Sequence, residues 1–322
     1  MEALSSYTKM IEAGLSTLDF PKTPERLYDP LRYFLQIGGK RIRPVLTILG
    51  AELFGADFKI ALPQALAIET FHNFTLIHDD IMDEAPLRRN QTTVHEKWNR
   101  DVAILSGDVL LVKAYQLLAQ INPKQLPEAL DLFNRTAAEV CEGQQMDMDF
   151  EERQDVTVPE YIEMIRLKTS ILLGGALTMG AIVANASAED KKHIYDFGQY
   201  IGIAFQIQDD ILDLYADPKK FGKQVGGDVI ANKKTMLHLT AIGACSSEQL
   251  SVLKQLQSEK NLEIKIEKTR SLFDHLGVKE SCRIRMDEYY QKALFSLEKV
   301  SVNESNKVEL RHLAAYLMER EL

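Results

Sequence analysis

Cysteine is scarce in this chain, whose 322 residues include only Cys141, Cys245 and Cys282, widely spaced and without a Cys-x-x-Cys pair. Such a set excludes a disulfide framework and a thiolate zinc site, and it favours a reducing compartment, so we expect a cytoplasmic protein. Long apolar runs are also lacking. The most apolar stretch, residues 171–184, is interrupted by glycine and threonine and falls short of the ~20 residues of a membrane span. Residues 1–20 carry charges where a signal peptide has its apolar core.

A surplus of positive charge is absent as well. The chain has 38 lysines and arginines against 47 aspartates and glutamates, a net charge of -9. Nucleic-acid binding requires a basic footprint, so we expect no nucleic-acid partner. An anionic ligand must therefore be bound by local basic clusters or by metal ions.

Strand-like alternation of apolar and polar residues is not found, and helical spacing dominates. Apolar residues recur at i, i+3, i+4 and i+7 in residues 62–81 and 102–118, and Pro63 suits a first helical turn. Residues 171–184 are expected to form a buried helix whose glycines allow close helix packing. Signals for helix N-termini occur at residues 157–160, at residues 187–190, and at Ser305 or Asn306. The sequence predicts one all-α domain of ten or more helices.

One short pattern occurs twice. Residues 79–83 read Asp-Asp-Ile-Met-Asp and residues 209–213 read Asp-Asp-Ile-Leu-Asp, both within apolar helical segments. On a helix the first and last aspartates of each pattern share a face, where like charges repel and do not stabilise the fold. A solvated acidic helix face would explain one copy, but two copies favour a divalent metal. Oxygen ligands without cysteine favour Mg²⁺ over Zn²⁺.

Basic residues are grouped near breaks in the helical pattern. Residues 38–44 read Gly-Gly-Lys-Arg-Ile-Arg-Pro, and Arg88 and Arg89 follow the first aspartate cluster. Glycine lets the backbone approach a ligand closely, and the arginine fork binds phosphate with two hydrogen bonds. Each of these groups alone could be an ordinary surface charge, and the phosphate-binding Walker pattern is absent. Together with the aspartates, they predict a diphosphate site.

Several motifs carry a family resemblance through their order and spacing. They are residues 38–44, His72 ahead of residues 79–83, Leu87-Arg88-Arg89, Gly143-Gln144, Lys168-Thr169, residues 206–213, Gly222-Lys223, and Gly227-Asp228 with Lys233 and Thr235. The chain resembles the trans-isoprenyl (polyprenyl) diphosphate synthase family over nearly its whole length, in its short-chain type. Asn90 and Asn232 stand where the family usually has glycine. At position 232 we expect asparagine to serve as a substitute, because it tolerates the left-handed conformation.

The resemblance implies a fold, an assembly and a cofactor. The fold would be an isoprenoid-synthase-like helical bundle around a central hydrophobic cavity, with residues 1–322 forming a single polyprenyl synthetase domain. The protein would be a homodimer and would bind two or three Mg²⁺ ions. The metal ligands would be Asp79, Asp83 and Asp209. The catalytic group would comprise Asp79, Asp80, Asp83, Asp209, Asp210, Asp213, Lys168, Thr169 and Gln206.

The resemblance also implies two diphosphate subsites. The residues that bind the allylic diphosphate (dimethylallyl, geranyl or farnesyl) would be Arg88, Lys168, Lys223 and Lys233. The residues that bind isopentenyl diphosphate would be Lys40, Arg43, His72 and Arg89. Thr169 and Gln206 would lie beside the reacting centre, and residues 217–227 would form a lid. The reaction would be ionisation of the allylic diphosphate, attack by isopentenyl diphosphate and proton loss, with the released diphosphate as the expected base.

Aromatic residues before the first aspartate cluster indicate the product length. Phe74 lies five residues before Asp79, which is about 7 to 8 Å along a helix. Phe71 shares its face, and Thr75 follows it. Each phenylalanine could be ordinary core packing, but as the floor of a hydrocarbon pocket an aromatic here stops growth early. With the resemblance, this predicts a C20 product, with C15 as the next choice.

Four alternatives remain open at this point. They are a longer-chain polyprenyl diphosphate synthase, a terpene cyclase of the same fold, an HD-type phosphohydrolase that uses His72, His78 and Asp79, and a non-catalytic subunit of a heteromeric synthase. A cyclase would lack the second aspartate pattern and the two arginine groups. A phosphohydrolase leaves residues 209–213 unexplained. A non-catalytic subunit generally loses an aspartate cluster, and this chain keeps both.

Overall fold

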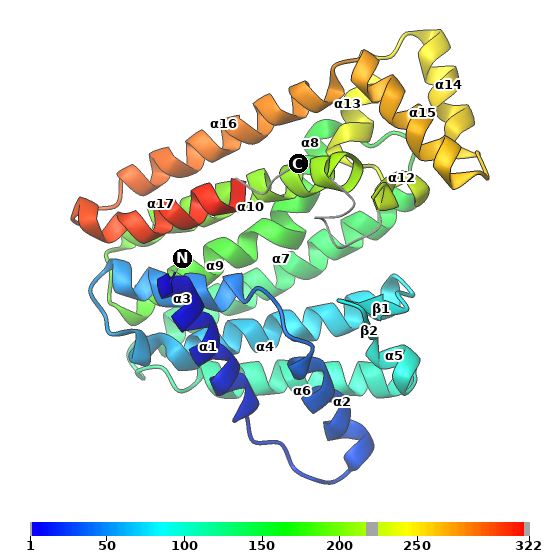
Figure 1. Cartoon of the computed structure of the whole chain (residues 1–322). Coiled ribbons are helices and arrows are strands. Elements are labelled where there is room, and N and C mark those ends of the chain that lie inside the picture. Colours follow the sequence, from blue (N-terminus) through cyan, green and yellow to red (C-terminus); the bar gives the residue numbers. More distant parts are fainter. Residues whose placement is uncertain (1, 217–224, 319–322) are drawn as a thin grey trace. The chain divides into compact units, whose positions relative to one another are not determined.

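The computed structural model describes residues 2–216 and 225–318, and these residues are mostly helical (Figure 1). The first helices are α1 (Glu2–Ser16), α2 (Glu25–Gln36), α3 (Ile42–Leu53), α4 (Phe58–Met82), α5 (Val94–Lys97), α6 (Arg100–Leu118), α7 (Leu126–Glu152), α8 (Val158–Ile165) and α9 (Ile171–Val183). They are followed by α10 (Ala188–Tyr215), α12 (Gly227–Ile230), α13 (Met236–Ala244), α14 (Ser247–Gln257), α15 (Leu262–His275), α16 (Val278–Glu298) and α17 (Glu304–Met318). The all-α prediction is confirmed.

Contacts within the chain divide it into two compact units. Unit 1 comprises Met1–Phe133 and Gly175–Lys191, and unit 2 comprises Asn134–Gly174 and Lys192–Leu322. The first aspartate cluster belongs to unit 1 and the second to unit 2. Each unit is therefore described by itself, and the single domain inferred from the sequence stays a prediction.

In unit 1, α4 and α6 pack along each other, and the chain between them forms β1, β2 and α5 (Figure 1). Helix α4 begins at Phe58, earlier than expected, because the Asp57 side chain accepts a hydrogen bond from the Lys59 amide at 2.8 Å. Pro63 therefore lies inside the helix, and its predicted place in the first turn was wrong. Asn99 caps α6 in the same way.

Glycines bring α3 and α9 close together in unit 1. A Cβ atom at Gly180 would overlap the Thr47 carbonyl oxygen, and one at Gly50 would overlap that of Leu177. Only glycine lets the two backbones approach this closely. The prediction that the glycines of the apolar stretch serve close helix packing is thus supported.

A β-hairpin joins α4 to α5, and the sequence analysis missed it. Strand β1 (Leu87–Arg88) pairs antiparallel with β2 (Gln91–Thr92). The two connecting residues, Arg89 and Asn90, have φ angles of 52° and 62°. Positive φ at both positions is typical of the type I′ turn that matches the twist of a two-residue hairpin. Asn90 therefore takes the left-handed conformation for which the family has glycine.

Unit 2 is built around α8, α10, α13, α15 and α16, which share one apolar core. Its largest fully buried side chain from α15 is Phe273. The capping box of residues 157–160 is present at the start of α8, as predicted. Helix α17 begins at Glu304, so the predicted cap at Ser305 or Asn306 was wrong, although its buried stripe of Leu310, Leu313, Ala314 and Leu317 was expected.

The segment α8, η1 (Arg166–Ser170) and α9 forms a continuous helix over Val158–Val183, longer than the apolar stretch suggested. By length and composition this helix could cross a membrane, but 83% of its most apolar window is buried in the protein. That burial is typical of a core helix in a soluble protein. The cytoplasmic location itself stays a prediction.

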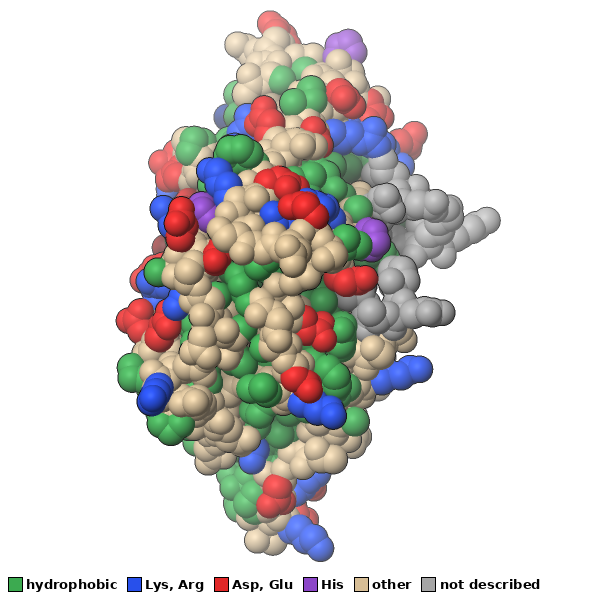
Figure 2. Space-filling model, turned by 90° about the vertical axis from the view of Figure 1, so that its left-hand side faces the viewer, with side chains coloured by type: hydrophobic (Ala, Val, Ile, Leu, Met, Phe, Trp, Pro, Cys, Tyr) green, Lys and Arg blue, Asp and Glu red, His purple; other side chains and the backbone are tan. Residues whose placement is uncertain are grey.

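Charges of both signs occur on the face of the molecule drawn in Figure 2. On the face shown in Figure 2, acidic and basic side chains are interspersed among hydrophobic ones. A nucleic-acid-binding surface would show a continuous basic patch. The described residues on this face do not form one.

Candidate active site

The first aspartate cluster lies at the C-terminal end of α4. The Asp83 amide donates to the Asp79 carbonyl at 2.9 Å, so the helical path continues through Asp83. Asp79 and Asp83 therefore project from the same side, as the i,i+4 spacing predicted. Asp80 differs, because it is 1% exposed whereas Asp83 is exposed.

The hairpin places Arg88 against this cluster. Its Nε donates to Asp80 Oδ1 at 2.7 Å, and its Nη2 donates to Asp79 Oδ2 at 3.2 Å. Burial raises the pKa of Asp80 to about 6, although the positive charge of Arg88 acts in the opposite direction. The other oxygen of Asp80, Oδ2, is buried and has no hydrogen-bond partner among the described residues. One arginine thus offsets part of the negative charge of two aspartates.

A cationic group lies further back along α4. Arg43, in the first turn of α3, has its Nη1 3.1 Å from His72 Nε2. Burial lowers the pKa of His72 well below its usual value, and the charges of Arg43 and Arg89 act in the same direction. The ring is therefore neutral at neutral pH and can accept a hydrogen bond from Arg43. Burial also lowers the pKa of Arg43, to about 10.

Glycines fit the loop before α3 to the tip of the hairpin. Gly38 and Gly39 have φ angles of 83° and 150°, values that other residues rarely adopt. Arg89 Nη1 donates to the Gly38 carbonyl oxygen, and a Cβ atom at Gly39 would overlap the guanidinium of Arg89. Lys40 follows with an exposed side chain. The structure thus brings together Lys40, Arg43, His72, Arg88 and Arg89 in unit 1.

The second aspartate cluster repeats the burial pattern of the first. Asp210 is 3% exposed, and its Oδ2 accepts hydrogen bonds from the Tyr161 hydroxyl and from the Met236 amide. Burial raises the pKa of Asp210 to about 8, and the charge of Asp228 acts in the same direction. Asp209 and Asp213 are partly exposed. In both clusters the middle aspartate is anchored inside the protein.

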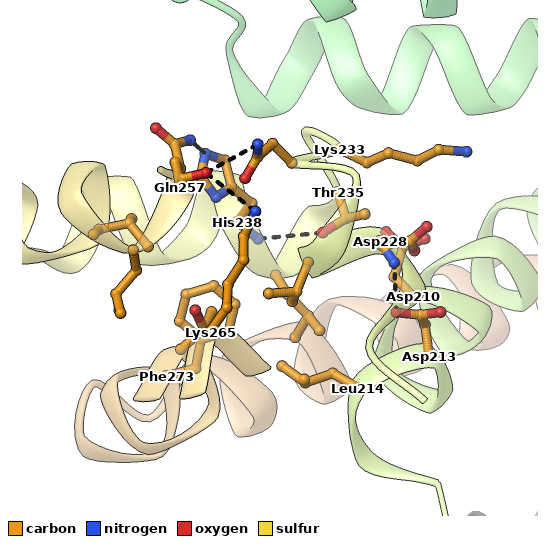
Figure 3. Close-up of a pocket in the computed structure, with 16 residues that line it drawn as sticks. Asp210, Asp213, Leu214, Asp228, Lys233, Thr235, His238, Gln257, Lys265 and Phe273 are labelled. Carbon is orange, nitrogen blue, oxygen red and sulfur yellow. Dashed lines mark hydrogen bonds between the residues drawn. The ribbon is translucent and has the colours of Figure 1, made fainter. Parts of the chain in front are cut away.

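Asp213 is linked to the turn that follows the second cluster. Its Oδ2 accepts from the Asp228 amide at 3.0 Å, and Figure 3 shows Asp210, Asp213 and Asp228 next to one another, with Lys233 extending from the following turn. The small cavity drawn there has a volume of about 30 Å³, room for about one water molecule rather than a substrate. Asn232 has a φ angle of 54°, so the predicted left-handed conformation is confirmed. Lys223, and residues 217–224 of the predicted lid, lie outside the described residues.

Lys168 and Thr169 lie on the π-helical turn η1. Such turns often occur at functional sites because they redirect side chains. Lys168 Nζ is 2.6 Å from Asp147 Oδ2 on α7, and Gly143 leaves space for the Lys168 backbone. Thr169 Oγ1 donates to Gln206 Oε1 at 3.3 Å, so these two residues contact each other, and their place beside the reacting centre stays a prediction.

The aromatic residues before the first cluster have different surroundings. Phe71 is 1% exposed and packs edge-on against Phe133, with ring centroids 5.2 Å apart. Phe74 is only partly buried and contacts both Phe71 and His78. The Thr75 hydroxyl donates to the His72 carbonyl within α4. Phe74 is thus the phenylalanine with a face available to a ligand.

Sequence reasoning missed three supporting residues, namely Tyr161, Asp147 and Glu69. Each has an ordinary helical context, and its role depends on a partner distant in sequence. Asp147 had a weak signal, since it lies one helical turn after the Gly143-Gln144 motif.

Comparison with known proteins is consistent with this site. Residues 24–274 match the Polyprenyl synthetase family. A geranylgeranyl pyrophosphate synthase from Geoglobus acetivorans is 39% identical, covering 99% of each chain. A geranylfarnesyl diphosphate synthase from Natronomonas pharaonis is 39% identical over 74% of this chain and 75% of its own. A crystal structure of a geranylgeranyl pyrophosphate synthase superposes with a TM-score of 0.94 at 43% identity, covering 99% of both chains.

The fold and these matches define a class of helical prenyltransferases, and the chain belongs to the polyprenyl synthetase family. Within it the chain is a trans-prenyltransferase of the short-chain isoprenyl diphosphate synthase type. The resemblance inferred from the motifs is confirmed. The terpene cyclase and longer-chain alternatives are not favoured.

Proposed function

We propose that this enzyme condenses isopentenyl diphosphate with an allylic diphosphate and that its main product is geranylgeranyl diphosphate. One observation carries the proposal. Unit 1 places an acidic cluster, Asp79 and Asp83, and a cationic group around Arg43 and His72 on or against the same helix, with Arg88 between them. Ionising one diphosphate while holding a second requires both kinds of group close together.

The carboxylates fit Mg²⁺. Among the described residues no three His, Cys, Asp or Glu side chains form a ready-made metal site. Mg²⁺ usually takes one or two carboxylates and completes its shell with water and substrate phosphate, so Asp79, Asp83 and Asp209 are suitable ligands for two or three ions. The buried free oxygen of Asp80 beside Asp79 is a further acceptor close to this site. When bound, Mg²⁺ would neutralise charge on the leaving diphosphate.

The basic residues divide between the two substrates. Arg88, Lys168 and Lys233, with Lys223 beyond the described residues, would bind the allylic diphosphate. Lys40, Arg43, His72 and Arg89 would bind isopentenyl diphosphate. Arg88 and Lys168 are already paired with carboxylates, so binding exchanges one anionic partner for another.

The remaining polar residues would act at the reacting carbons. Thr169 Oγ1 and Gln206 Oε1 are oxygen acceptors without formal charge, which can stabilise an allylic cation without forming a bond to it. Gln206 Nε2 lies 3.4 Å from Asp210 Oδ1, which fixes the amide. We retain the released diphosphate as the proposed base. The site must exclude water, which would trap the cation as an alcohol.

The product length rests on Phe74. The names of the relatives include both geranylgeranyl and geranylfarnesyl diphosphate synthases, which differ by one C5 unit in product. A partly exposed phenylalanine five residues before Asp79 would stop the growing chain. We therefore favour the C20 product, with C15 next.

The direct test is incubation of the purified enzyme with Mg²⁺, isopentenyl diphosphate and, in separate reactions, dimethylallyl, geranyl or farnesyl diphosphate. Product chain length is then measured by chromatography after dephosphorylation. We expect geranylgeraniol from all three primers. Failure to consume isopentenyl diphosphate would contradict the proposed reaction, and a longer or shorter product would contradict only the assigned length.

We also propose that the enzyme is a homodimer, as the family resemblance implies. Helix α6 exposes an apolar stripe in the single chain. Leu105 is 57% exposed and Val112, seven residues later, is 56% exposed, and Ile104 and Tyr115 flank them. Apolar residues at helical spacing on a surface mark an interaction face. Light scattering is expected to give twice the chain mass, and Val112→Asp to shift it towards the monomer. A wild-type mass of 36.5 kDa would contradict the dimer.

A further inference from the structure

Arg41 lies between two residues assigned to isopentenyl diphosphate, Lys40 and Arg43, yet its side chain faces the protein interior. It is 4% exposed, whereas Lys40 is exposed. Its φ angle of 50° is left-handed, at the N-cap of α3. A left-handed conformation is unfavourable for a residue with a long side chain, so surrounding contacts must hold it.

Those contacts are made by Glu69 and by α2. Arg41 Nη1 donates to Glu69 Oε1 at 2.6 Å, and Nη2 donates to the Leu35 carbonyl at 3.0 Å. Glu69 is 3% exposed and also accepts from Asn73 Nδ2 at 3.2 Å. The guanidinium fork thus joins the end of α2 to the middle of α4. A lysine has a single ammonium group and lacks the planar fork that makes both contacts.

The Arg41–Glu69 pair lies beside the Arg43–His72 pair, which belongs to the proposed isopentenyl diphosphate site. Glu69 and His72 are three residues apart on α4 and share a face. Arg41 and Arg43 are two residues apart at the start of α3. The contacts Arg41–Glu69 and Arg43–His72 therefore attach the start of α3 to α4 at two neighbouring points.

The charge balance gives Glu69 a second effect. The positive charges of Arg41, Arg43 and Arg89 all lower the pKa of His72. The charge of Arg41 also lowers the pKa of Arg89. The carboxylate of Glu69 opposes the effect of burial on the pKa of both Arg43 and Arg89, which favours their cationic forms. A buried ion pair alone is weak support for a stabilising role, because desolvation offsets much of the attraction. The pair lies next to Arg43 and Arg89, the cationic residues assigned to the substrate, which points to a role in positioning them.

We propose that Arg41 and Glu69 are positioning residues for isopentenyl diphosphate. Their buried pair fixes the left-handed start of α3, and this orients Lys40 and Arg43 towards the diphosphate without either residue of the pair touching it. This inference rests on the proposed function, since it concerns the subsite of the same reaction.

The test uses two conservative variants, Arg41→Lys and Glu69→Gln, in the full chain. Arg41→Lys keeps the positive charge but removes the fork, and Glu69→Gln keeps the size and an acceptor oxygen but removes the negative charge. We expect the KM for isopentenyl diphosphate to rise by roughly tenfold or more, the loss typical of one charge-assisted contact. The KM for the allylic substrate and kcat are expected to change by less than about threefold.

A matched control separates positioning from simple loss of stability. Lys307 in unit 2 is 2% exposed, and its Nζ donates to Glu304 Oε1 at 2.9 Å and to the Glu298 carbonyl at 3.0 Å. Lys307→Met removes a buried cation whose partners, Glu298 and Glu304, are not among the assigned residues. It is expected to lower the unfolding midpoint while both KM values stay unchanged.

Three outcomes would overturn the inference. The first is a similar rise in both KM values in both variants, and the second is a lower unfolding midpoint with unchanged KM values in both variants. The third is tighter binding of isopentenyl diphosphate by Glu69→Gln, which would mean that the carboxylate only opposes the substrate. Failure of the proposed function is distinguishable, because it would already be seen as no reaction in the wild-type enzyme.

Discussion

Arg88 Nε lies 2.7 Å from Asp80 Oδ1, so a residue assigned to substrate binding is paired with the acidic cluster. The same guanidinium reaches Asp79 at 3.2 Å. Burial raises the pKa of Asp80 to about 6. The positive charge of Arg88 opposes this effect, because it favours the ionised carboxylate. Arg88 therefore favours the ionised form of Asp80, and under the proposed function it would also bind the allylic diphosphate.

The first prediction concerns this pairing. Arg88→Met is expected to lower kcat/KM for the allylic substrate by roughly 100-fold or more, since it removes a charged donor at the site of charge development. Steady-state kinetics with saturating isopentenyl diphosphate measures the effect. Arg283→Met on the exposed face of α16 is the control and should behave as wild type. A change below threefold in Arg88→Met would contradict the assignment.

Asn90 supports the hairpin through its φ angle of 62°. Replacing it with glycine is expected to leave stability and activity unchanged. Asn90→Ala should destabilise the protein by about 1 kcal/mol, because alanine tolerates the left-handed region poorly. It should also weaken substrate binding through Arg88 and Arg89. Urea unfolding and KM values of the two variants measure the difference, and equal behaviour would show that the turn does not depend on this conformation.

Phe74 is predicted to set the product length. Phe74→Ala should shift the product beyond C20 with a modest loss of stability, because the side chain is only partly buried. Phe71→Ala is the matched comparison. It should cost about 3 to 5 kcal/mol of stability, since Phe71 is a fully buried core residue. An unchanged product from Phe74→Ala would refute its role as the pocket floor.

His238 provides a test of pH dependence. Burial lowers its pKa to about 4, and the charge of Lys234 acts in the same direction. Because the unfolded chain binds the proton near pH 6.5, the free energy of unfolding falls as the pH drops from 6.5 towards 4. His238→Gln should remove this part of the loss, about 2 kcal/mol between roughly pH 7.5 and pH 5. Urea unfolding at both values measures it, and identical pH dependence in both proteins would contradict it.

The two aspartate clusters are predicted to serve the same catalytic step. Asp79→Asn and Asp209→Asn are each expected to lower kcat by roughly 100-fold or more. The kcat of the double variant should be only slightly lower than that of the less active single variant. Product formation at several Mg²⁺ concentrations measures this. Fully additive losses would indicate that the clusters serve separate steps.

Periodicity was sufficient to predict the all-α fold, and motif order was sufficient to predict the family, because both are encoded locally. The i,i+4 spacing of Asp79 and Asp83, and asparagine at position 232, each depend only on neighbouring backbone geometry. The sequence also indicated the cap at residues 157–160, where both partners lie within one turn.

Contacts between distant residues could not be predicted in this way. The sequence assigned no role to Arg41, and its pairing with Glu69 shows that it faces inward. The burial of Asp210 could not be predicted, because it depends on hydrogen bonds from Tyr161 and Met236. The hairpin was missed because strands of two residues carry no periodicity.

The central proposal, which follows from the family resemblance, is that Asp79, Asp83 and Asp209 bind the same magnesium-coordinated diphosphate. A crystal structure of the enzyme with Mg²⁺ and an unreactive allylic thiodiphosphate tests it most directly. We predict metal ions that bridge both clusters to one diphosphate group. Electron density with the diphosphate held by one cluster alone, and the other cluster turned away from it, would contradict the account.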